Sequence, residues 1–207
     1  MTPRPDYTTF VLNDLGQEDR YKLMTGLVVP RPIGWIGTRS PEGVNNLAPY
    51  SFFNTVAGTP PTVLFSPGRR DGEPKDSLTN VLASGAFTVN FVTEDLAEAM
   101  NHTSGEYAPD VDEFTLTGLT PIDGDVVDAP FVGEAAAVAE CELLQTVELG
   151  NPPENTVVFG SVVLIHIRSD LHDGTRINHE AIKIVGRMAG GSYTNTADGL
   201  FEMQRPD

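Results

Sequence analysis

The sequence predicts a mainly β fold, and within that class a β-barrel rather than a doubly wound sheet. Stretches typical of strands recur at 33–39, 47–57, 62–66 and 86–92. Helical patterns are few and short, and no strand–helix–strand unit repeats. The 207 residues contain no Ser-, Gly- or Pro-rich linker, so we expect one domain over residues 1–207.

The first element expected is a helix. Asp14 followed by Gln17 resembles a capping box, and the helix should then run to about Gly26. Pro30 and Pro32 end the helical pattern, since proline cannot donate to the helical ladder. The first strands follow directly.

Two more short helices are expected between the later strands. Asp76 is placed to cap a helix over 77–83, which ends at Ser84-Gly85. Residues 94–102 form the other helix. Residues 103–130 then resemble a loop with clustered acids, and a loop of that length usually serves as a lid or an interaction segment.

Two long strands close the predicted fold, near 134–149 and 156–169, and the turn sequence GNPPEN joins them. On the second strand five apolar side chains are expected to share one face: Val157, Phe159, Val163, Ile165 and Ile167. The remaining tail begins as a strand and becomes Gly-rich.

The formal net charge is −16, with 29 acidic and 13 basic residues. So acidic a surface repels phosphate backbones and anionic lipids, which argues against nucleic acid and membranes as partners. From Arg31 to Lys75, however, five basic residues face only three acidic ones. Positive charge is therefore concentrated in one stretch, as an anionic ligand requires.

The single cysteine, Cys141, excludes an intrachain disulfide, and its strand-like surroundings predict a buried, unreactive thiol. The N-terminal sequence has no apolar signal segment. The longest apolar stretch, 157–167, is too short to cross a bilayer as a helix. We therefore expect a cytoplasmic protein.

Several common chemistries lack their signatures. The chain has no G-x-G-x-x-G after a strand, no G-x-x-x-x-G-K-[ST] and no G-x-S-x-G. Its four histidines, His102, His166, His172 and His179, show no metal-binding spacing, so no metal site is expected.

Three groups of polar segments remain. The first contains RPIGWIGTRS from Arg31 and NNLAPYSFFN from Asn45; the second is KDSLTN at 75–80; the third is GRMAGGSY at 186–193. Each alone is compatible with an ordinary turn or helix cap. In this order and spacing they resemble the flavin reductase-like family of FMN-binding split β-barrels, over nearly the whole chain.

The resemblance implies a Greek-key type split β-barrel with a few short helices. It also implies a homodimer, with FMN held near the interface, that passes electrons from NAD(P)H to flavin, possibly for a partner monooxygenase. Two alternatives stay open: a flavin electron-transfer or FMN-binding protein without nicotinamide-dependent activity, and a binding module that kept the barrel and lost the cofactor. No general acid or base stands out, and hydride transfer between two cofactors needs none.

The residue types agree with an FMN site. A phosphate needs hydroxyls, cations and backbone N–H groups, which Thr38, Arg39, Lys75 and the helix start at Ser77 can supply. The flavin ring needs close backbone approach, which Ala48 and Pro49 would permit. The predicted cofactor-binding residues are Thr38, Arg39, Asn46, Leu47, Ala48, Pro49, Ser51, Phe53, Lys75, Asp76, Ser77, Arg187 and Tyr193. Arg187 either joins the cation cluster or pairs with an acid.

Overall fold

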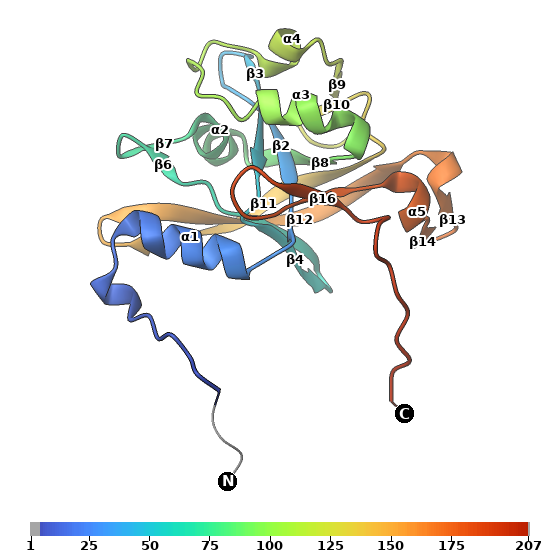
Figure 1. The fold of residues 1–207 in the computed structure, drawn as a ribbon. Helices are drawn as coiled ribbons and strands as arrows, with labels where there is room; N and C mark the ends of the chain where they lie inside the picture. The colour runs from blue at the N-terminus through green and yellow to red at the C-terminus, as the bar shows by residue number, and fades with distance from the viewer. Residues whose placement is uncertain (1–4, 207) are drawn as a thin grey trace.

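The computed structural model describes residues 5–206 and is built on an antiparallel sheet of seven strands (Figure 1). The strand order is β3-β2-β8-β11-β12-β5-β4. The strands are β2 (Gly34–Arg39), β3 (Asn45–Tyr50), β4 (Phe53–Gly58), β5 (Pro61–Phe65), β8 (Ala86–Phe91), β11 (Ala137–Gly150) and β12 (Pro153–Ile167). The mainly β prediction is confirmed. The domain predicted over 1–207 includes residues 1–4 and 207, which lie outside the described residues.

Smaller sheets surround the large one. They pair β1 (Arg31–Pro32) with β15 (Val185–Arg187) and β16 (Tyr193–Asn195), β6 (Arg69–Arg70) with β7 (Glu73–Pro74), β9 (Pro121–Asp123) with β10 (Pro130–Val132), and β13 (His172–Asp173) with β14 (Arg176–Ile177). The first of these sheets brings the Gly-rich tail against the strand that follows the first helix.

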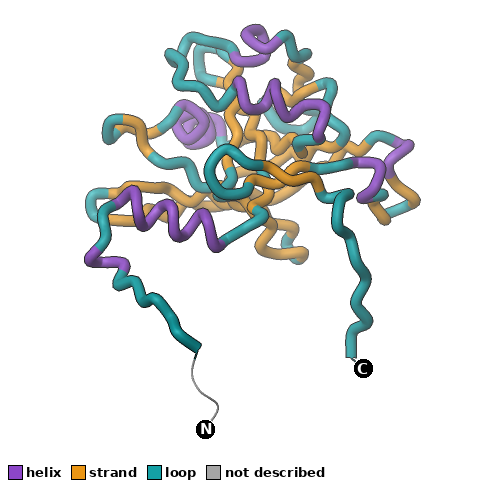
Figure 2. Tube along the Cα trace, viewed as in Figure 1, coloured by secondary structure: helices purple, strands orange, loops and turns teal. Residues whose placement is uncertain are grey.

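The helices are short and peripheral (Figure 2). They are α1 (Gln17–Leu27), α2 (Asp76–Ser84), α3 (Ala97–His102), α4 (Glu113–Thr117) and α5 (His179–Ile182), with 3₁₀ turns at Leu12–Asp14, Glu94–Leu96 and Ser169–Leu171. The three predicted helices are confirmed in α1, α2 and the pair Glu94–Leu96 with α3. Helix α2 packs on β2 and β3, whereas α3 and α4 pack on β3.

The predicted helix starts need correction. Asp14 ends a 3₁₀ turn, and Gly16 occupies the N-cap of α1 without any side-chain hydrogen bond, so the capping-box prediction is wrong. Lys75 rather than Asp76 is the N-cap of α2. Gly85 ends α2 as predicted, because its φ of 72° is a left-handed conformation that glycine adopts without strain.

The segment predicted as a lid or interaction loop, 103–130, packs on its own chain. It contains α4 and β9, and Phe114 is fully buried among residues of the core. Asp112 caps α4 by accepting hydrogen bonds from the backbone N–H groups of Phe114 and Thr115. The Trp35 indole N–H donates to Thr103 Oγ1 at 2.8 Å. These contacts make the segment part of the fold.

A bulge changes which side chains of β12 share a face. The pairing of β11 with β12 shifts between Glu140 and Cys141 and leaves Val163 as an extra residue of β12. Side chains alternate along a strand, so one extra residue exchanges the two faces beyond it. Val157 and Ile165 therefore lie on opposite faces, and the prediction of one shared apolar face is wrong.

Two apolar clusters pack against β2 and β3. Successive side chains of a strand point to opposite faces, so Trp35 enters one cluster with Leu47 while Ile36 enters the other with Phe53. Cys141 is buried in the second of these, which confirms the buried thiol, and burial raises the pKa of this thiol to about 12, as the prediction of an unreactive thiol requires. Within residues 5–206, no helix combines the length and the apolar character needed to cross a membrane.

One fully buried carboxylate anchors a loop beside β11. Glu140 accepts hydrogen bonds from the backbone N–H groups of Asp125, Val126 and Val127 at 2.9, 2.8 and 3.0 Å, and His166 Nε2 lies 2.7 Å away. Burial raises the pKa of Glu140, but these hydrogen bonds outweigh burial and hold it below its ordinary value. Ligand atoms of Asp125, Glu140 and His166 lie within 4.8 Å of one another, as a metal ion would require. Because both Glu140 oxygens already accept N–H groups, anchoring the loop explains the cluster.

We expect Glu140→Gln to lower the free energy of unfolding by about 2–3 kcal/mol at neutral pH, since charged hydrogen bonds are lost. A carboxylate with a lowered pKa contributes stability above its unfolded pKa and loses it as pH falls through the folded pKa. The deficit should therefore shrink in acid. Denaturant unfolding at pH 7 and pH 4 measures it, with Glu142→Gln, an exposed position on the same strand, as control. Equal deficits at both pH values would contradict this account.

Candidate functional site

Two adjoining hollows lie at the end of β3. The wide hollow, of about 320 Å³, is lined by Tyr21, Thr25, Arg31, Ile33, Pro49, Ser51, Met100, Ser104, Arg187, Gly190 and Tyr193. The narrow hollow, of about 40 Å³, is lined by Asn46, Ala48, Pro49, Tyr50, Arg70, Lys75, Asp76, Ser77, Thr103, Ser104, Gly105 and Glu113. Pro49 and Ser104 line both. The two hollows therefore adjoin at these shared residues and together make up the candidate site.

Arg31 holds the walls of the wide hollow together. Its buried guanidinium donates to the carbonyl oxygens of Thr25 and Val28 at 2.6 and 2.9 Å, at the C-terminal end of α1. It also donates to Met188 O at 3.1 Å and to Ser51 Oγ at 3.3 Å. One side chain thus fixes α1, the end of β3 and the loop after β15 around the same space.

Arg187 stacks on an aromatic ring in the wide hollow. Its guanidinium lies 4.5 Å from the centroid of Tyr193 and donates to the Tyr193 hydroxyl and to Gly190 O. Among residues 5–206 it has no carboxylate partner. The sequence left two roles open for Arg187, and the structure does not show the second of them, pairing with an acid.

The narrow hollow presents two basic side chains. Lys75 precedes α2, and its ammonium lies 6.0 Å from the ring centroid of Tyr50. Arg70, from β6, donates through Nη1 to Tyr107 O at 2.9 Å. Its Nε is buried and finds no hydrogen-bond partner in the described part of the chain. A buried N–H without an acceptor is costly, so an anion placed there would satisfy it.

Under the narrow hollow lies a buried network of hydroxyls and amides. Ser77 Oγ donates to Asn46 Oδ1 at 2.8 Å, and the Tyr50 hydroxyl donates to Ser77 Oγ at 3.1 Å. Asn80 donates to Thr38 Oγ1 at 3.1 Å, and Thr38 donates to Asn46 Oδ1 at 3.4 Å. Burial raises the pKa of Tyr50 to about 12, so its hydroxyl stays a donor. The network joins β2, β3 and α2.

Glu113 completes the network from α4. Its carboxylate accepts from Asn46 Nδ2 and from the backbone N–H of Leu47, both at 3.0 Å, and only 5% of the residue is exposed. Burial raises the pKa of Glu113 above its ordinary value, and the hydrogen bonds from Leu47 and Asn46 offset part of that rise. Glu113 thus fixes the backbone of β3 where it borders the hollow.

Most of the predicted residues come together here. Those that line the hollows are Asn46, Ala48, Pro49, Ser51, Lys75, Asp76, Ser77, Arg187 and Tyr193. The side chains of Leu47 and Phe53 instead enter the core, where the Phe53 ring packs over Gly34. Thr38 is fully buried in the network.

Arg39 lies elsewhere. It forms ion pairs with Asp123 and Asp128, donates to Asn45, and lines a separate hollow with Ser84. These two acidic partners raise the pKa of its guanidinium.

Among the lining residues that the predicted site list omits are Arg31, Arg70, Ser104 and Glu113. For Arg31 and Arg70 a signal existed, since both belong to the locally basic stretch. Glu113 had none in its spacing, because 67 residues separate it from Asn46.

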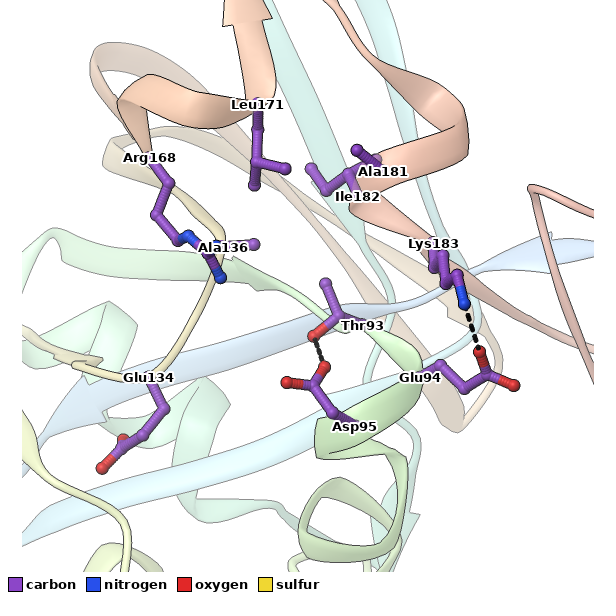
Figure 3. A pocket seen from close by; sticks show the side chains of 10 residues that line it. All are labelled: Thr93, Glu94, Asp95, Glu134, Ala136, Arg168, Leu171, Ala181, Ile182 and Lys183. Carbon is purple, nitrogen blue, oxygen red and sulfur yellow. Dashed lines mark hydrogen bonds and ion pairs between the residues drawn. The ribbon is translucent and has the colours of Figure 1, made fainter.

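Another hollow, of about 430 Å³, lies near α5 (Figure 3). Each of the two basic side chains that line it already has an acidic partner: Arg168 pairs with Asp170 at 2.7 Å, and Lys183 with Glu94 at 3.8 Å. The narrow hollow, with its unpaired N–H, therefore suits an anionic ligand better.

The family model of the flavin reductase like domain matches residues 25–182. The chain belongs to this family. An uncharacterized protein of Deinococcus radiodurans is 41% identical over 96% of this chain and 90% of its own. Nitrilotriacetate monooxygenase component B from Bacillus cereus is 34% identical, with a TM-score of 0.91 over 98% of this chain and 100% of that one. The 2-nitrobenzoate 2-nitroreductase of Pseudomonas fluorescens is 28% identical, with a TM-score of 0.87 over 96% of each chain.

These matches confirm the predicted split β-barrel and support a flavin-related oxidoreductase. The site fits a flavin. The narrow hollow offers the orphaned Arg70 N–H and Lys75, which suit a phosphate. The wide hollow combines apolar surfaces of Ile33 and Met100 with hydroxyls such as that of Ser51, which suit a polar aromatic ring.

Ala48→Trp should lower flavin occupancy at least tenfold and leave the melting temperature of the protein without flavin within a few degrees. Ala48 is only half-buried on the wall of the narrow hollow, so an indole would fill the space that a ligand needs. Flavin absorbance after purification, together with thermal unfolding, measures both effects. Ala83→Trp, on the exposed side of α2, is the control. Full occupancy in the Ala48 variant would place the flavin elsewhere.

Proposed function

We propose that the chain is an NAD(P)H-dependent flavin reductase that binds FMN with its phosphate in the narrow hollow and its ring in the wide hollow. The observation that carries the proposal is that the two hollows adjoin: a narrow one, where Arg70 has an unsatisfied N–H and Lys75 lies nearby, lies beside a larger one with apolar and hydroxyl walls. Bound flavin would supply the hydride-accepting chemistry.

The chain's own residues bind and orient the cofactor in this proposal. Lys75, Arg70 and the N-terminal end of α2 bind the phosphate. Pro49, which lines both hollows, adjoins the ring, and Ser51 and Ser104 offer hydroxyls to its polar edge. Arg31 keeps these groups in place by fixing α1 and the loop after β15.

Anaerobic mixing with NADH or NADPH tests the reductase activity. Rapid bleaching of flavin absorbance supports the proposal. Flavin that stays oxidised with both nucleotides, but is reduced by dithionite, would instead identify a flavin electron-transfer protein. A protein that binds no flavin would be the module that kept the barrel without the cofactor.

We further propose that the reduced flavin serves a partner monooxygenase in the cytoplasm. The support is the 34% identity, over 98% of this chain, to a structure described as a monooxygenase component B. The whole of residues 1–207 would act as one flavin-binding domain.

Lys75→Ala should weaken FMN about ten- to hundredfold, the factor that corresponds to one charged hydrogen bond of ~1.5–3 kcal/mol. Riboflavin lacks the phosphate, so its affinity should change little. Arg39→Ala removes an equal charge at the separate hollow and should leave FMN affinity within about twofold. Fluorescence titration of both flavins measures the effects. Equal loss of FMN and riboflavin in the Lys75 variant would remove this residue from the phosphate site.

The homodimer expected from the sequence is part of the proposal. Along α1 and around β4, the chain exposes an apolar band that consists of Tyr21, Met24, Leu27, Val28, Phe52 and Val56. Leu27 is 78% exposed and Val28 54%. Contiguous apolar surface on a soluble protein usually marks an interface. Tyr21 also lines the wide hollow, which would place the cofactor near the partner.

Light scattering at micromolar concentration should give twice the mass of one chain. Leu27→Asp should shift this toward the monomer, because it buries a charge in the interface. Leu116→Asp, exposed on α4, is the matched control. A parent protein that is monomeric with flavin bound would overturn the dimer.

A further inference from the structure

The narrow hollow contains as many acidic as basic side chains. Arg70 and Lys75 face Asp76 and Glu113 around a space of about 40 Å³. Their formal charges cancel, so a phosphate monoester that carries nearly two negative charges at pH 7 would leave the hollow anionic. The cost of that excess is largest for the acid with the least access to water.

That acid is Glu113. It is 5% exposed, whereas Asp76 is half-buried in the first turn of α2, where the helix dipole stabilises a negative charge. Burial raises the pKa of Glu113, and the charge of Asp76 raises it further. The other charged or titratable groups near it are Arg70 from β6, Lys75 before α2, Tyr50 from β3 and Asp112, the N-cap of α4.

The two oxygens of Glu113 have different partners. Oε2 accepts from the Leu47 N–H at 3.0 Å and from Asn46 Nδ2 at 3.2 Å. Oε1 accepts only from Asn46 Nδ2, at 3.0 Å, among the described residues. A proton on Oε1 would remove the negative charge and still leave Oε2 to hold the backbone of β3.

We propose that Glu113 takes up one proton from solvent, at Oε1, when a phosphate monoester enters the narrow hollow. This rests on the proposed function, in which FMN brings the phosphate. Binding then depends on pH with a defined sign. Between the pKa of Glu113 in the free protein and its higher pKa in the complex, each unit rise in pH weakens binding by up to tenfold. Riboflavin brings no phosphate, so it causes no such coupling.

Glu113→Gln tests this, because glutamine is a neutral side chain of the same shape. FMN and riboflavin are titrated into the parent protein and the variant from pH 5 to pH 9. The ratio of the parent's FMN dissociation constant to the variant's should be smallest at pH 5 and should rise, by about tenfold, toward pH 8–9. The variant thus binds FMN more tightly at high pH. The titration of the phosphate itself cancels in this ratio, and the riboflavin ratio should stay flat.

Calorimetry in buffers of different ionisation enthalpy measures the proton directly, and it needs only the parent protein if the variant fails to fold. At pH 8, above the second pKa of a phosphate monoester of about 6, FMN binding should take up as much as one proton in the parent protein and in Asp76→Asn, and none in Glu113→Gln. If Glu113→Gln weakens the binding of FMN and riboflavin equally at every pH, or if FMN binds without proton uptake, the role of Glu113 is overturned while the proposed function stands. A parent protein that binds no FMN overturns the proposed function together with this inference.

Discussion

The buried amide of Asn46 is the constraint on which the site depends. Its Nδ2 donates to Glu113 of α4, and its Oδ1 accepts from Ser77 of α2 and Thr38 of β2. An amide this deeply buried costs about 1–3 kcal/mol for each polar group left unpaired. The folded state therefore needs α4, α2 and β2 all in place around Asn46. The narrow hollow exists because this network, rather than apolar packing, fills the junction of β3, α2 and α4.

A second buried polar group performs the same task for the wide hollow. Arg31 has no acidic partner among the described residues, and its guanidinium is satisfied by carbonyl oxygens from α1 and from the loop after β15. A charge buried in this way specifies geometry, because no other arrangement of those carbonyls would satisfy it. Both hollows are therefore bounded by polar groups that the chain's own hydrogen bonds hold in position, which is the preorganisation that tight binding requires.

The sequence was sufficient to predict most strands and helices and the motif segments. It was not sufficient to predict which basic residues line the narrow hollow. Strands at 33–39 and 86–92 follow from local patterns, and the motif segments do converge on one site. Arg39 and Arg70 look equivalent in sequence, yet Arg39 meets Asp123 and Asp128, more than 80 residues away, while the β6–β7 hairpin turns Arg70 into the hollow. The bulge at Val163 and the partnership of Glu113 with Leu47 likewise depend on register between distant segments, which single-residue preferences do not encode.

Because the overall charge is −16, the affinity for an anionic cofactor would depend on the local geometry of its site. A chain this acidic cannot attract an anionic cofactor from a distance, since its long-range field is repulsive. In the proposed function, affinity must therefore come from contacts made inside the narrow hollow, where a hydrogen bond to a charge is stronger than in bulk water. A buried carboxylate at that position is then costly unless it has a structural task. Glu113 has one, because without its oxygen the Leu47 N–H would be buried and unpaired. The residue that shapes the hollow is thus also the one whose charge an incoming anion must overcome.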